Sequence, residues 1–144
     1  MNKKIAIGAD HAGYDLKCEL IIYLKHKGFS VVDFGCSSPA SIDYPDYAHP
    51  VAEMVQNEGI PGILICGSGN GISMSANKHS GVRCALCWSA EIAELARQHN
   101  DANIISLPAR YISESSAIKC VDVFLKTEFE GGRHERRVNK IPCS

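Results

Sequence analysis

The chain has 144 residues, 45% of them hydrophobic and 22% charged, and its net charge is −1. This length predicts one domain, residues 1–144, that can bury a core without a disulfide or a structural metal. The near-neutral charge argues against a nucleic-acid partner, which would favour a strong basic excess. The apolar run after the first lysines is too short for a secretory signal or a membrane span. The chain has seven cysteines, and an odd number favours free thiols over a set of disulfides. We therefore expect a cytoplasmic protein with no membrane partner.

The first part of the chain predicts alternating strands and helices. Its first elements, in order, are a strand at 3–8, a helix at 14–27 that Gly28 ends, and a strand at 30–34. Asp43 and Pro45 then indicate the start of a second helix, with Asp43 as its cap and Pro45 in its first turn. Pro50 leaves the beginning of this helix open, because proline lacks the backbone N–H that a helix interior uses.

The rest of the chain continues this alternation. Its predicted elements are, in order, a strand at 62–66, a glycine-rich turn with a helix to about Lys78, a strand at 82–88, a helix at 90–99 capped by Ser89, a strand at 103–107, a helix from its cap Ser113 to about Thr127, and a short basic helix after Gly131 and Gly132. Apolar strands joined by helices predict a parallel sheet that is covered on both faces. The predicted fold is therefore α/β, a three-layer α/β/α sandwich with a five-stranded parallel Rossmann-like sheet.

The segment from Ile63 to Ser73 carries the strongest chemical signal. A buried strand runs into a loop with glycine at alternate positions, and a helix follows. Ligands bind beyond the carboxyl ends of strands in open parallel sheets, and loop amides near a helix N-terminus attract negative charge. The loop lacks the third glycine of a dinucleotide fingerprint, since Ile72 stands there, and the lysine of a nucleotide-hydrolase loop. A plain tight turn is the remaining alternative, although it needs fewer glycines.

Cys66 is the last residue of the predicted strand before this loop. A cysteine in such a place is usually a small buried hydrophobe. A thiolate is also stabilised near a helix N-terminus, which would make Cys66 a base or a nucleophile. The residues alone leave both interpretations open.

Cys84 and Cys87 form a Cys-x-x-Cys spacing for which we predict no redox or metal role. They fall within a predicted strand, where residues three apart point to opposite faces. No second pair completes a zinc site. We expect neither a metal nor another cofactor.

Six motifs in order along nearly the whole chain resemble the ribose/galactose isomerase family, in particular ribose-5-phosphate isomerases of type B and their galactose- and allose-6-phosphate relatives. The motifs are Gly8-Ala9-Asp10-His11-Ala12-Gly13, Asp43-Tyr44-Pro45, Cys66-Gly67-Ser68-Gly69-Asn70-Gly71-Ile72, Ala76-Asn77-Lys78, Arg97-Gln98-His99-Asn100-Asp101-Ala102-Asn103 and Gly131-Gly132-Arg133-His134-Glu135-Arg136-Arg137. Each motif alone is suggestive, and all six in order are highly specific.

The resemblance implies a metal-free aldose–ketose isomerisation between ribose 5-phosphate and ribulose 5-phosphate, in the pentose phosphate pathway. A base takes a proton from carbon 2 and returns it to carbon 1 through an enediolate. One branch of the family uses a cysteine at the end of the third strand, and another uses a glutamate just past the glycine loop. Here Cys66 is present and Ile72 holds the glutamate position. The resemblance therefore assigns Cys66 as the base.

The resemblance assigns two more catalytic residues. Ser68, beside the base, would relay or orient a hydroxyl proton; taken alone it is a helix-capping serine. His99 would open the closed sugar ring, which suits a side chain that titrates near neutral pH. Taken alone, His99 and Asn100 merely end a helix.

The resemblance also implies the residues that bind the substrate. They are Asp10, His11, Tyr44, Gly67, Gly69, Asn70, Gly71, Asn100, Arg110, Arg133 and Arg137. The loop amides would stabilise the oxyanion of the intermediate, and Arg133 and Arg137, four apart on a helix, would hold the phosphate. Taken alone, Asp10 is a helix cap, Tyr44 a packing residue, and the arginine-rich tail a solvated basic end.

The family builds its site across a homodimer, so by analogy His99, Asn100 and the phosphate arginines face Cys66 of a partner chain. The sequence leaves open whether dimers pair into a tetramer. Two alternatives remain open. One is an isomerase of a six-carbon sugar phosphate such as allose or galactose 6-phosphate. The other is a non-catalytic sugar-phosphate sensor, although such a protein has no need for the retained Cys66.

Overall fold

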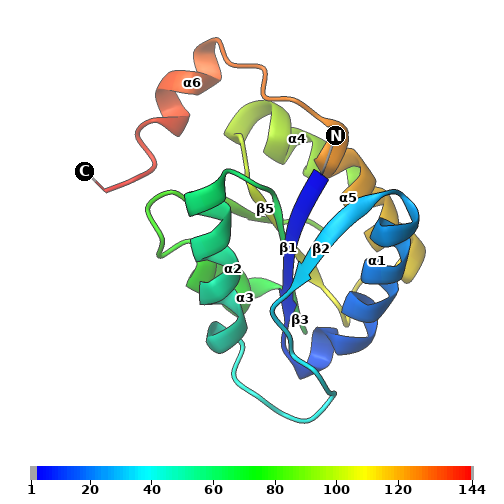
Figure 1. The fold of residues 1–144 in the computed structure, drawn as a ribbon. Helices are drawn as coiled ribbons and strands as arrows, with labels where there is room; N and C mark the ends of the chain where they lie inside the picture. The colour runs from blue at the N-terminus through cyan, green and yellow to red at the C-terminus, as the bar shows by residue number, and fades with distance from the viewer. Residues whose placement is uncertain (1–2, 144) are drawn as a thin grey trace.

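Five parallel strands in the order β2-β1-β3-β5-β4 form the centre of the fold (Figure 1). The computed structural model describes residues 3–143. The strands are β1 (Lys3–Ala9), β2 (Phe29–Asp33), β3 (Gly62–Cys66), β4 (Cys84–Leu86) and β5 (Ile104–Pro108). Every residue of β3 and β5 is buried, as expected for strands covered on both faces.

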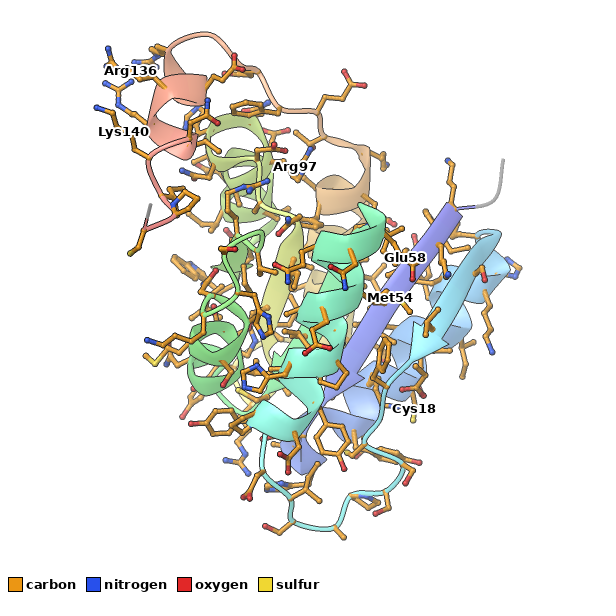
Figure 2. The ribbon with its side chains drawn as sticks, turned by 60° about the vertical axis from the view of Figure 1, so that its left-hand side comes forward. Cys18, Met54, Glu58, Arg97, Arg136 and Lys140 are labelled. Atoms are coloured by element: carbon orange, nitrogen blue, oxygen red, sulfur yellow. The ribbon has the colours of Figure 1, made fainter. Side chains whose placement is uncertain are left out.

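Helices cover both faces of this sheet and make the sandwich predicted from the sequence. They are η1 (His11–Gly13), α1 (Tyr14–His26), α2 (Pro45–Glu58), α3 (Asn70–Ala76), α4 (Ala90–Asn100), α5 (Glu114–Lys126) and α6 (Arg133–Val138). One core joins α1, α4 and α5 to alternate strand residues such as Ile5 and Ile7, and the other joins α2 and α3 to Ala6 and Leu64. Helix α6 packs against α4 and projects from the body of the molecule (Figures 1 and 2).

The predicted elements are all present, and their boundaries differ by a few residues. The prediction for β3 is correct at both ends, and Ser89 and Ser113 cap α4 and α5 through their side chains. The predicted strand at 82–88 is too long, because only 84–86 form β4. The amide of Val82 instead closes a turn by donating to the carbonyl of His79.

The start of α2 corrects a second prediction. The cap is Tyr44 rather than Asp43, and it makes no side-chain capping bond. The helix also continues through Pro50. Proline removes one backbone hydrogen bond there, but Val51, Ala52 and Val55 are buried against the sheet and hold the helix in place.

The order of the strands places a crevice between β1 and β3. The chain leaves β1 toward β2 on one side and later returns to β3 on the other, which makes this a switch point of the kind where open α/β sheets bind ligands. The amide of Asp10, just after β1, donates to the carbonyl of Ile65 in β3, so the two strand ends lie together. In Figure 1 this carboxyl edge is at the bottom, and α6 is at the top. No helix among residues 3–143 is long and apolar enough to cross a membrane.

Candidate active site at the end of β3

Cys66 ends β3 at the carboxyl edge of the sheet and is 5% exposed. It belongs to the core between the sheet and α2 and α3. Its carbonyl accepts a hydrogen bond from the amide of Ala109, which fixes the backbone of Cys66 to the end of β5. The thiol therefore occupies a rigid position beside the loop that follows.

Four further cysteines, Cys36, Cys84, Cys87 and Cys120, have their thiol pKa raised by burial. Burial raises the pKa of Cys84 and of Cys87 to about 12, and it also raises the pKa of Cys36 and of Cys120. These four thiols stay protonated at neutral pH. Cys84 and Cys87 also belong to different cores on opposite faces of the sheet, as the strand spacing predicts.

The glycine loop presents backbone N–H groups next to Cys66. Within the described part of the chain, the amides of Gly67, Ser68 and Gly69 donate no hydrogen bond, so they are free to bind an anion. Ser68 Oγ accepts hydrogen bonds from the amide and the side chain of Asn70, at 3.3 and 3.2 Å. The Ser68 hydroxyl proton is thus left to donate to a ligand.

Gly69 holds the loop in a conformation that only glycine fits. Its φ is 80°, in the left-handed region, and a Cβ there would overlap Cδ1 of Leu86. Its carbonyl accepts a 2.7 Å hydrogen bond from the hydroxyl of Ser106, a fully buried residue of β5. Sequence reasoning missed Ser106, because one serine in an apolar strand carries no motif.

We expect Ser106→Ala to lower the free energy of unfolding by about 1 kcal/mol, because it removes the short hydrogen bond to the buried Gly69 carbonyl and leaves only the 3.4 Å contact from the amide of Ser73. Chemical denaturation would measure this change. Ser30→Ala, at an exposed position of β2, is the matched control and should change stability little. Equal stability of the two variants would show that the Ser106 hydrogen bond does not hold the loop.

Two predicted substrate-binding side chains contact this loop. The phenol ring of Tyr44 lies against Gly71, where an added Cβ would be 2.5 Å from Cζ. The guanidinium of Arg110 lies over Gly67, where an added Cβ would be 3.1 Å from Nη1. Glycine at 71 therefore makes room for the ring of Tyr44, and glycine at 67 makes room for the guanidinium of Arg110, beside the free amides.

Asp10 and His11 lie at the same edge, after β1. Oδ1 of the Asp10 carboxylate caps η1 by accepting hydrogen bonds from the amides of Ala12 and Gly13. His11 Nδ1 accepts a 3.2 Å hydrogen bond from the amide of Ile42, so Nε2 carries the proton. His11 thus anchors the segment between β2 and α2 to the site and keeps an N–H donor.

The four other predicted site residues, His99, Asn100, Arg133 and Arg137, are at the opposite edge of the sheet. Asn100 ends α4, shortly before β5 begins, and the amide of Gly62 at the start of β3 donates to Asn103 nearby. Helix α6, which carries the arginines, packs on α4. The structure therefore does not bring these residues to Cys66 within one chain.

His99 does have neighbours that sequence reasoning left out. Its ring stacks on that of His134, with centroids 4.2 Å apart and planes at 14°. Glu130 Oε1 lies 3.9 Å from His99 Nε2 and 3.7 Å from His134 Nε2. Burial lowers the pKa of His134, as do the nearby His99 and Arg133. The four-residue spacing of Glu130 and His134 was the available signal for this cluster.

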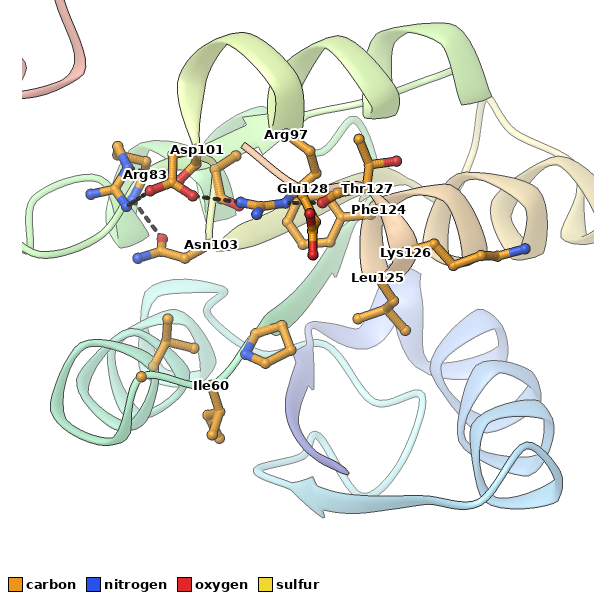
Figure 3. Close-up of a pocket in the computed structure, with 14 residues that line it drawn as sticks. Ile60, Arg83, Arg97, Asp101, Asn103, Phe124, Leu125, Lys126, Thr127 and Glu128 are labelled. Atoms are coloured by element: carbon orange, nitrogen blue, oxygen red, sulfur yellow. Dashed lines mark hydrogen bonds and ion pairs between the residues drawn. The ribbon is translucent and has the colours of Figure 1, made fainter. Parts of the chain in front are cut away.

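A cavity of the fold lies away from Cys66. It has a volume of about 490 Å³ and lies between the C-terminal ends of α2, α4 and α5 (Figure 3). Its arginines are already engaged: Arg97 donates to Asp101, Ala102 and Thr127, and Arg83 donates to Asp101. These bonds secure the end of α4, so we assign the cavity a structural role.

The fold and the carboxyl edge define an open α/β protein with a buried thiol beside a glycine loop with free amides. The chain belongs to the ribose/galactose isomerase family, whose model matches residues 5–141.

Relatives with assigned names agree with this membership. The chain is 49% identical to a probable ribose-5-phosphate isomerase B of Mycoplasma genitalium, over 98% of this chain and 95% of the relative. It is 44% identical to ribose-5-phosphate isomerase B of Escherichia coli, over 96% and 94% of the two chains.

Solved structures share the whole fold. A ribose 5-phosphate isomerase of Thermotoga maritima superposes with a TM-score of 0.96, at 48% identity and 99% coverage of both chains. Ribose-5-phosphate isomerase B of Mycoplasma genitalium with bound ribulose-5-phosphate superposes with a TM-score of 0.94, at 49% identity and coverage of 98% and 95%.

Proposed function

We propose that this protein is an aldose–ketose isomerase that interconverts ribose 5-phosphate and ribulose 5-phosphate. The observation that carries the proposal is the thiol of Cys66, fixed beside a loop whose amides are free. A thiolate can act as a base, and free N–H groups can stabilise the charge that this base creates. The names of the relatives, and the ribulose-5-phosphate bound by the Mycoplasma genitalium enzyme, support this substrate.

In the proposed mechanism, the Cys66 thiolate takes the proton from carbon 2 of the open-chain aldose. The electrons left behind form an enediolate, and the free amides of Gly67, Ser68 and Gly69 stabilise its oxyanion. The Ser68 hydroxyl gives its proton to the oxygen on carbon 1 and takes the hydroxyl proton from the oxygen on carbon 2. The Cys66 thiol then returns its proton to carbon 1, which leaves the carbonyl on carbon 2 and regenerates the thiolate. Ile72 has a hydrocarbon side chain with no proton-accepting atom, so the loop offers no second base at that position.

The proposal includes a homodimer that completes each site with His99, Asn100, Arg133 and Arg137 of the partner chain. These residues lie too far around the fold to meet their own Cys66. Exposed apolar side chains near the loop support an interface there: Met74 on α3 is 66% exposed, and Trp88 after β4 is 58% exposed. The partner's His99 would open the furanose ring before Cys66 acts on the open chain.

We expect Arg137→Ala to raise the Michaelis constant by about 10- to 100-fold with a smaller change in turnover number, since a hydrogen bond to a charged group contributes about 1.5–3 kcal/mol. Steady-state kinetics with ribose 5-phosphate measures both constants. Arg136→Ala is the matched control, because Arg136 extends outward from the same helix (Figure 2). An unchanged Michaelis constant for Arg137→Ala would rule out the phosphate clamp.

The proposed function is tested by the isomerisation of ribose 5-phosphate in the presence of a metal chelator. Formation of ribulose 5-phosphate at full rate supports the proposed reaction and its independence of metals. Faster turnover of allose or galactose 6-phosphate would assign a six-carbon substrate instead. Binding of ribose 5-phosphate without any product would assign a sensor.

The proposal also places the reaction in the pentose phosphate pathway and in the cytoplasm. A thiol base must stay reduced, and the cytoplasm maintains reduced thiols. All seven cysteines are free in the structure, in agreement with this compartment.

A further inference from the structure

Three side chains with metal-binding atoms meet beside α6, away from the thiol and the glycine loop. His99 comes from the end of α4, Glu130 from the segment that follows α5, and His134 from the first turn of α6. One ligand atom from each of them lies within 4.8 Å of the others. Two imidazoles and a carboxylate are a ligand set of open zinc sites, which leave the fourth position to water or substrate.

The spacing of these atoms is close to what a zinc ion requires. Tetrahedral bonds of about 2.0–2.1 Å place neighbouring ligand atoms roughly 3.3 Å apart. Glu130 Oε1 is 3.9 Å from His99 Nε2 and 3.7 Å from His134 Nε2, so each contact must shorten by roughly 0.5 Å. The stacked rings must also tilt toward each other. The side chains of Glu130 and His99 are 52% and 38% exposed, so both have room to make this adjustment.

The surrounding charges set the strength of such a site. The Glu130 carboxylate brings one negative charge to the ion. Arg133 and Arg137 lie on the same short helix and oppose a cation, and Arg137 Nη1 already donates to the carbonyl of Arg133. We therefore expect binding that is weaker and more reversible than at a structural zinc site, as suits inhibition rather than folding.

We infer that His99, Glu130 and His134 form a binding site for Zn²⁺, and that bound zinc inhibits the enzyme by occupying His99. Zinc on the Nε2 of His99 replaces the proton that this nitrogen must exchange with the sugar ring. The inhibitory part rests on the proposed function, whereas the binding part does not.

Binding is measured by isothermal titration calorimetry of the full chain with Zn²⁺ near neutral pH, under reducing conditions that do not chelate metals. We expect Glu130→Gln and His134→Asn each to weaken binding at this site by at least about tenfold, since even the loss of a residue that supports a ligand costs about 10- to 100-fold. Glu128→Gln and His26→Asn, both at exposed positions, are the matched controls and should bind as the original chain does.

The free cysteines are the competing ligands, and Co²⁺ distinguishes them from the proposed site. Thiolate–cobalt complexes show a near-ultraviolet charge-transfer band that nitrogen and oxygen ligands lack. The site is supported if the Co²⁺ complex of the original chain gives an absorption spectrum without this band, and if that spectrum disappears in Glu130→Gln. A spectrum dominated by the band, or unchanged zinc affinity in both variants, would overturn it.

Inhibition is measured separately. We expect the loss of activity to follow the occupancy of one Zn²⁺ site per chain and to be reversed by a chelator. The loss should require at least about tenfold more free zinc in His134→Asn, whose binding is weaker by that factor. If the chain binds zinc at these ligands but shows no isomerase activity without metal, the proposed function fails and the site remains. If zinc binds there and turnover is unaffected, the inhibitory role is wrong.

Discussion

Replacing Cys66 with alanine is expected to lower the turnover of ribose 5-phosphate by about 10²- to 10⁴-fold, the usual contribution of a positioned general base. The loss falls on the chemical step, because the sulfur takes and returns the carbon-bound proton. Substrate binding should be largely retained, since the loop amides and the arginines are unchanged. Steady-state kinetics and calorimetric titration of the inactive variant with ribose 5-phosphate measure these two effects.

The controls for this experiment separate chemistry from folding. Cys18→Ala changes a half-buried thiol on α1 and should keep full activity. Cys66→Ser keeps the shape of the side chain but offers a much weaker acid than a thiol, so it should also be nearly inactive. Full activity of Cys66→Ala would show that another group is the base.

Replacing Gly69 with alanine is expected to lower both stability and turnover. The positive φ costs about 1–2 kcal/mol for a residue with a Cβ, and the overlap with Leu86 adds about 1–3 kcal/mol. The loop must also shift, which displaces the amides that bind the oxyanion, and a displacement of about 1 Å can reduce the rate by about 100-fold. Denaturant unfolding and kinetics measure the two effects.

Gly59 provides the matched control for this variant. It also has a positive φ, of 68°, but no atom lies within 4 Å of an added Cβ. Gly59→Ala should therefore show only the backbone cost and should leave turnover unchanged, because it lies at the end of α2. If Gly69→Ala were as stable and as active as Gly59→Ala, crowding at the loop would have no role in the site.

The fold could be derived from the sequence because the strands are short, apolar and separated by clear helix signals. Strand β3 was predicted at both ends, since Gly62 to Cys66 is a continuous apolar run between breakers. The ends of strand β4 were not predicted, because the apolar residues continue beyond the strand. Hydrogen bonds of the turn before it and of the helix cap after it decide where it begins and ends. The Tyr44 cap and the intact helix at Pro50 depend on packing against the sheet, which local preferences do not contain.

The carboxyl-edge part of the site could also be derived, and the remainder could not. Cys66, the glycine loop, Asp10 and His11 follow strand ends that any parallel sheet brings together. The hydrogen bond from Ser106 to Gly69 joins positions 37 apart in sequence, and the stacking of His99 on His134 joins two helices. Contacts of this kind depend on tertiary structure, and neither residue type nor spacing predicts them.

The separation of His99 and the arginines from Cys66 has a genetic consequence. In the proposed dimer, one chain without its thiol and one without its phosphate arginine can together assemble one intact centre and one doubly defective centre. Two inactive alleles would then complement each other when expressed in the same cell. Two alleles that damage the same edge of the sheet would not.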